Sequence, residues 1–107
     1  MTNNNSEIIS ERQLIVADIF YKIWKYWTPA IKISKLLKRY AITDDQLDEY
    51  IRLLKEAKDK VDVQEFQSQL ALIIDRVEKV KHLEAESRKQ ELLEIREIME
   101  MFKEIYI

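Results

Sequence analysis

The densest run of apolar positions in the chain covers residues 14–27, where eleven of fourteen residues are aliphatic or aromatic. On a helix its three polar residues, Asp18, Lys22 and Lys25, fall into one narrow stripe. A helix with so little polar surface must be enclosed by other elements to be stable in water. We therefore predict a helix over residues 7–27 around which the rest of the chain packs.

Helix-start signals predict two further short helices after this run. The Thr-Pro pair at residues 28–29 suits the N-cap and first position of a helix over residues 29–40, because proline lacks only an N–H that has no partner there. A threonine and a glutamine at the capping-box spacing predict a helix over residues 44–60. Ser10 with Gln13 offers the same box near the start of the first helix.

Residues 63–107 contain no glycine or proline and consist mostly of good helix formers. A single helix of this length would extend about 65 Å. Two apolar stripes with alternating spacings of three and four run along it, out of phase with each other, and few apolar residues lie between them. We predict a continuous helix, because no residue between the stripes favours the left-handed conformation in which helices often end. A break at Ser87, with Gln90 completing a capping box, is the alternative.

The second stripe predicts an interface if the helix is continuous, since it would extend beyond anything that the chain itself can cover. The economical partner is a second copy of the chain, in a coiled-coil contact that forms a homodimer. If the helix breaks instead, the same residues are the core of a monomeric bundle. The predicted interface residues are Leu92, Ile95, Met99, Phe102 and Tyr106.

Composition sets the fold class. The chain of 107 residues has no glycine and one proline, so the tight turns that join strands lack the residues they need. We predict an all-α fold, a helical bundle of three shorter helices plus a long C-terminal helix that mediates dimerisation. Residues 1–62 would form a helical core and residues 63–107 the long helix, together in one structural domain.

Charge is unevenly distributed along the chain. The net charge is −2, yet residues 19–43 contain six cations and no acid. Most of these cations share one face of the predicted helix at 29–40, which we interpret either as ordinary solvated surface or as a contact for polyanions. The candidate polyanion-binding residues are Lys22, Lys25, Lys32, Lys35, Lys38 and Arg39.

Aromatic residues adjoin these cations, and they are open to two interpretations. They could stack against the bases of a single-stranded nucleic acid. Because the first helix is apolar on nearly every side, we instead expect them to belong to the core. The residues concerned are Phe20, Tyr21, Trp24, Tyr26, Trp27 and Tyr40.

Catalytic and metal-binding chemistry has little support in the sequence. There is no cysteine and no glycine-rich phosphate loop, and His82 is the only histidine. Arg76, the one residue that we considered as its catalytic partner, lies six positions earlier and would face about 120° away on a regular helix. We expect no enzyme activity, no metal site, no cofactor and no small-molecule substrate.

The predicted function is therefore that of a small non-enzymatic helical protein in interaction, regulation or assembly. The alternative is a nucleic-acid-binding protein that contacts phosphates without reading sequence, through the basic face of the second helix. Neither a signal peptide nor a transmembrane segment is recognisable, so we expect a cytoplasmic protein. The expected partner is a second copy, with another protein or a nucleic acid as alternatives.

Overall fold

The computed structural model describes residues 8–106, with side chains for residues 8–102. The described part contains no strand, so the all-α prediction is confirmed. It consists of five α-helices and one short 3-10 turn. In chain order they are α1 (Glu11–Ile23), α2 (Pro29–Leu37), α3 (Asp44–Ala57), the 3-10 turn η2 (Lys58–Lys60), α4 (Gln64–Val80) and α5 (Ala85–Tyr106).

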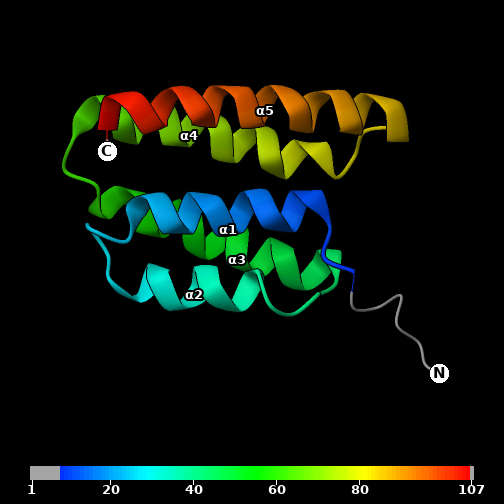
Figure 1. The fold of residues 1–107 in the computed structure, drawn as a ribbon, viewed down its shortest axis with the longest axis horizontal. Coiled ribbons are helices and arrows are strands. Elements are labelled where there is room, and N and C mark those ends of the chain that lie inside the picture. Colours follow the sequence, from blue (N-terminus) through cyan, green and yellow to red (C-terminus); the bar gives the residue numbers. More distant parts are fainter. Residues whose placement is uncertain (1–7, 107) are drawn as a thin grey trace.

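Helix α1 is enclosed by the other helices, as its composition predicts. Figure 1 shows α4 and α5 above it, α2 below it and α3 behind it, and it contacts all four of them. Ile15, Phe20 and Ile23 have no solvent exposure. Burying each such side chain contributes about 1.5–3 kcal/mol to folding, so this helix is the centre of the core.

Helices α2 and α3 begin where they were predicted to begin and end before their predicted ends, whereas α1 is displaced at both ends and begins at Glu11, not at residue 7. Helix α1 ends at Ile23, whose carbonyl accepts from the backbone N–H of Tyr26 and Trp27 as the chain turns toward α2. The capping box at the start of α3 is confirmed: Thr43 Oγ1 accepts from Gln46 N at 3.1 Å, and Gln46 Oε1 accepts from Thr43 N at 2.9 Å. Local signals thus predicted where helices begin better than where they end.

The prediction of one continuous C-terminal helix is wrong. The chain turns at residues 81–84, before Ser87, and α5 returns antiparallel alongside α4 (Figure 1). The turn needs no left-handed residue, because no residue in the described range has a positive φ. Reversal explains the phase shift between the two apolar stripes: each stripe sits on its own helix and each faces the same core.

The predicted dimer stripe lies inside the molecule. The exposed fractions of Leu92, Ile95, Met99 and Phe102 are 8%, 0%, 4% and 5%. The Phe102 ring meets that of Phe66 on α4 edge to face, with centroids 5.8 Å apart. The side chain of Tyr106 lies outside the described residues. The reason for placing a second copy on this stripe is therefore removed, because the chain covers it with its own helices.

Candidate functional site

The six predicted polyanion-binding residues form what we call the basic surface, and they differ in how free they are. Lys25, Lys32, Lys35 and Arg39 are exposed and make no ion pair within the described part of the chain. Lys32 and Lys35 are three residues apart on α2, which places them on the same side of that helix. These four cations are available to an external anion.

Of the other two residues of the basic surface, Lys22 lies in the last turn of α1 and Lys38 follows the end of α2. Lys22 and Lys38 both line a shallow hollow of about 250 Å³ together with Asp18 and Tyr21. Lys38 Nζ lies 3.0 Å from Asp18 Oδ1 and 5.6 Å from the centre of the Tyr21 ring. Asp18 therefore neutralises part of the positive charge beside α1, whereas the lysines within α2 are not neutralised in this way.

The expectation that the neighbouring aromatics are core residues is only partly correct. Phe20 is fully buried, and Tyr26 and Trp27 pack partly against the core. Tyr21, Trp24 and Tyr40 are 49%, 37% and 57% exposed. Tyr21 lies within α1 and Trp24 directly follows its last residue, Ile23, so this end of the helix is not fully enclosed.

Only three residues of α2 are buried. Ala30 and Leu37 are buried, and Ser34 is buried with them. Leu36 is 41% exposed, and Tyr40 lies beyond the helix end, with the Arg39 guanidinium 5.9 Å from the centre of its ring. The exposed side of this segment therefore combines cations with apolar and aromatic surface.

A second charged group, which sequence reasoning missed, centres on Arg12 of α1. This residue is 4% exposed. Its Nε donates to the Val77 carbonyl at 2.9 Å, and its Nη2 donates to Asp48 Oδ1 at 3.2 Å. It thereby joins α1 to α3 and α4. The sequence offers no signal for this burial, because Arg12 stands in the polar first turn of α1 between Glu11 and Gln13.

Lys81, at the end of α4, completes this group. It donates to Asp48 Oδ2 and lies 3.6 Å from Asp45 Oδ1. Burial raises the pKa of Asp48, but the hydrogen bonds from Lys81 and Arg12 outweigh it and hold that pKa below its usual value. The hydrogen bond to Asp48 raises the pKa of Lys81. Asp48 and Lys81 are therefore both charged near neutral pH.

Gln13 is the other buried polar residue of α1, and it ties down the link between α2 and α3. Its Nε2 donates to the carbonyls of Leu37 and Tyr40 at 2.7 and 2.6 Å, and its Oε1 accepts from Ile42 N at 3.1 Å. Ser10 Oγ caps the helix as predicted, accepting from Gln13 N at 3.1 Å. The glutamine side chain satisfies the neighbouring segment instead of returning to the cap.

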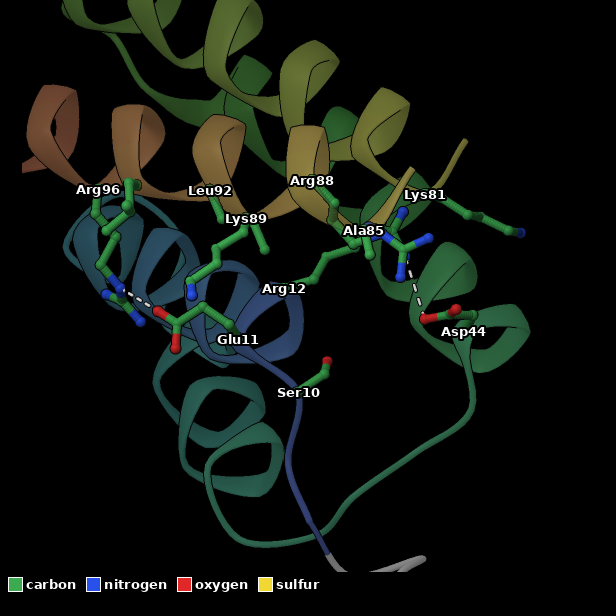
Figure 2. Close-up of a pocket in the computed structure, with 11 residues that line it drawn as sticks. Ser10, Glu11, Arg12, Asp44, Lys81, Ala85, Arg88, Lys89, Leu92 and Arg96 are labelled. Atoms are coloured by element: carbon green, nitrogen blue, oxygen red, sulfur yellow. Dashed lines mark hydrogen bonds and ion pairs between the residues drawn. The ribbon is translucent and has the colours of Figure 1, made fainter. Parts of the chain in front are cut away.

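A cavity of about 540 Å³ opens between the start of α1, the start of α3 and the first turns of α5. Figure 2 shows its wall: Lys89 extends from α5 toward the start of α1, and Arg12 extends from α1 toward the link between α4 and α5. Two acids, Glu11 and Asp44, face five cations around it. The five are Arg12, Lys81, Arg88, Lys89 and Arg96.

Part of this positive charge is already committed. Arg96 pairs with Glu11 and with Asp18, whose Oδ2 lies 2.8 Å from Arg96 Nη1. Burial lowers the pKa of Arg96, but its hydrogen bonds to Asp18 and Glu11 outweigh burial and raise that pKa above its usual value. Lys89 has no ion pair within residues 8–102. The cavity therefore has an uncompensated positive charge.

The residues considered for catalysis are not placed together for it. Arg76 donates to Glu91 through Nε at 2.6 Å and Nη2 at 2.9 Å, and also to Glu94 at 2.9 Å, which joins α4 to α5. His82 is exposed in the turn and lines a different, small hollow. Arg76 is a structural residue of the helical pair.

The described residues contain neither a metal-binding cluster nor a membrane-spanning helix. No group of three or more histidine or acidic side chains between residues 8 and 102 is arranged to hold a metal ion. None of the helices within residues 8–106 has the length and apolar character needed to cross a membrane.

Comparison with known proteins found no match. No family model fits the chain, and neither a curated protein nor a solved structure shows significant similarity to it.

Proposed function

We propose that this protein is a non-enzymatic helical binding protein whose basic surface contacts the phosphates of nucleic acids. The observation that carries the proposal is the set of exposed cations with no internal ion pair, Lys25, Lys32, Lys35 and Arg39. Cations paired within a protein gain little from phosphates, whereas unpaired ones release counterions from the nucleic acid when they bind it.

Exposed aromatic rings favour a single strand over a duplex. Tyr21, Trp24 and Tyr40 are at least one-third exposed and lie within a few residues of the basic surface. Unpaired bases stack on such rings, at about 1–3 kcal/mol per base, and they do so without strong sequence preference. Contacts to phosphates and stacking on bases need no helix in the major groove. Binding of this kind therefore does not select a particular nucleotide sequence.

Self-association through α5 is not part of this proposal. The stripe that suggested it is buried against α4 and α1 within one chain. The proposal keeps the predicted class, a non-enzymatic interaction protein, and assigns its activity to α2 and the end of α1.

The test is the affinity for fluorescent twenty-nucleotide single strands of mixed sequence, DNA and RNA, measured by anisotropy in 50 mM salt. Lys35→Glu is expected to weaken binding by about tenfold, because it removes one phosphate contact and adds a repulsive charge. Lys60→Glu is the matched control: Lys60 is exposed on η2 with no ion pair in the described structure, and the change in net charge is the same.

Two results would contradict the proposal. One is equal loss of affinity in both variants, because the effect would then come from net charge and not from the basic surface. The other is tight binding to vesicles of anionic phospholipid with no binding to either oligonucleotide, since lysines beside exposed aromatics also suit a membrane surface.

A further inference from the structure

The cavity between α1, α3 and α5 is separate from the basic surface and has features of a ligand site. We propose that it binds a small amphiphilic anion, a molecule with a carboxylate or phosphate head and an apolar chain. Its volume of about 540 Å³ lies within the range of small-molecule sites. The proposal does not depend on nucleic-acid binding.

One wall of the cavity supplies apolar surface for the chain of such a molecule. Ala85, Leu92 and Leu93 all come from α5, and Figure 2 shows Ala85 and Leu92 beside the cations. Leu93 is 54% exposed, so its side chain is open to contact by a ligand in the hollow. A positively charged rim around an apolar wall favours a ligand that has both a negative charge and an apolar chain.

One donor on the polar side of the cavity makes no hydrogen bond. Arg12 Nη1 is fully buried and has no hydrogen-bond partner in the described structure, although Asp44 Oδ1 lies 3.6 Å away in an ion pair that is longer than a hydrogen bond. Buried guanidinium N–H groups nearly always make a hydrogen bond, so one without a hydrogen bond beside a hollow marks the place for an oxygen. An anionic head group supplies that oxygen in a charge-assisted hydrogen bond.

Two cations on α5 reinforce this preference for an anion. Lys89 makes no ion pair with any side chain of residues 8–102, and Arg88 donates only to the Leu83 carbonyl, at 3.0 Å. Both side chains line the cavity together with Arg12. Positively charged ligands, such as alkylammonium ions, would be repelled by these cations.

The experiment is a titration of the full chain with four ten-carbon probes below their micelle concentrations, followed by calorimetry. The probes are decanoate, decyl phosphate, decanol and decyltrimethylammonium. Decanoate or decyl phosphate is expected to bind with one-to-one stoichiometry, and the tighter of the two identifies the head group. The ammonium probe is expected to bind more weakly than the tighter anion by tenfold or more.

Variants locate the site and keep the test independent of folding. Leu93→Glu places a carboxylate in the apolar wall and is expected to abolish binding of the anion, whereas Leu72→Glu, at a 64% exposed position of α4, leaves it unchanged. Lys89→Glu is expected to weaken binding at least about tenfold, and Lys60→Glu is its control.

The outcomes are separable. Failure of both anions to bind at millimolar concentration overturns the proposal, as does binding that Leu93→Glu and Lys89→Glu leave unchanged. Equal binding of the ammonium probe overturns it too, because the site would then be merely apolar. Lys35→Glu is expected to leave the anion affinity unchanged, so a failure here and a failure of the proposed nucleic-acid function are distinguishable.

Discussion

Replacing Ile95 with alanine tests whether the second apolar stripe belongs to the core of a single chain. Ile95 is fully buried on α5, whereas its neighbour Leu93 is 54% exposed on the same helix. Truncating a buried isoleucine to alanine costs about 2–5 kcal/mol, from lost burial and from the cavity that is left. Because Ile95 has no solvent exposure, we expect Ile95→Ala to lower the free energy of unfolding by about 3–4 kcal/mol. Leu93→Ala is expected to lower it by less than about 1 kcal/mol.

This loss is large for a chain of 107 residues, whose total stability is expected to be about 5–15 kcal/mol. It corresponds to a fall in Tm of roughly 15–25 °C. Urea unfolding followed by circular dichroism at 222 nm measures the free energy of unfolding directly.

Protein concentration distinguishes the chain's own core from an interface. The structure predicts that the unfolding midpoints of the wild type and of Ile95→Ala do not move between 2 and 100 µM protein, on the order of a fifty-fold range. A midpoint that rises with concentration, or equal effects of Ile95→Ala and Leu93→Ala, would refute the placement of this stripe in the chain's own core.

Three further variants test local features of the structure. Glu91→Gln is expected to lower the free energy of unfolding by about 1 kcal/mol at pH 7. Hydrogen bonds from Arg76 hold the pKa of Glu91 below its usual value. The stabilisation that Glu91 contributes is therefore present above about pH 5 and is lost as pH falls through its folded-state pKa. Urea titrations from pH 7 to pH 3 should therefore show a shallower decline for the variant, and a parallel decline would refute this. Gln13→Ala leaves two carbonyls and one N–H without their partner and should cost about 2–3 kcal/mol, against little for exposed Gln69→Ala; similar melting temperatures would refute the role of Gln13. Thr43→Ala should cost about 1 kcal/mol by removing a cap, and an unchanged urea midpoint would argue against it.

The features that the sequence predicted correctly are those with local causes. The absence of glycine excluded tight-turned sheets, the apolar run predicted an enclosed α1, and the capping box at Thr43 predicted the start of α3. The first signal is a property of the composition, and the other two each lie within one segment of the chain. Helix starts follow from them because a cap satisfies N–H groups of the first turn.

The turn at residues 81–84 was missed because the wrong signal was given weight. We took the lack of a left-handed residue as evidence of continuity, yet the chain reverses without any positive φ in the described range. The out-of-phase stripes were the better signal, since two stripes that face one core require two helices. The prediction of the interface at Leu92, Ile95, Met99 and Phe102 followed from that error.

The polar contacts and the cavity depend on partners that lie far apart in the sequence. Gln13 pairs with a carbonyl 24 residues away, and Arg12 pairs with one 65 residues away. No local pattern indicates which of the many polar side chains will meet in this way. The cavity has the same origin, because its walls come from the starts of three helices that only the complete fold brings together.

The most direct test of the central claim, that the basic surface binds nucleic-acid phosphates, is the salt dependence of the affinity for a single strand. Four free cations predict that log K falls against log salt concentration with a slope of about −3 between 50 and 200 mM salt. Lys35→Glu is expected to reduce the slope by about 0.7. A slope near zero, or no binding at the lowest salt concentration, would contradict the claim.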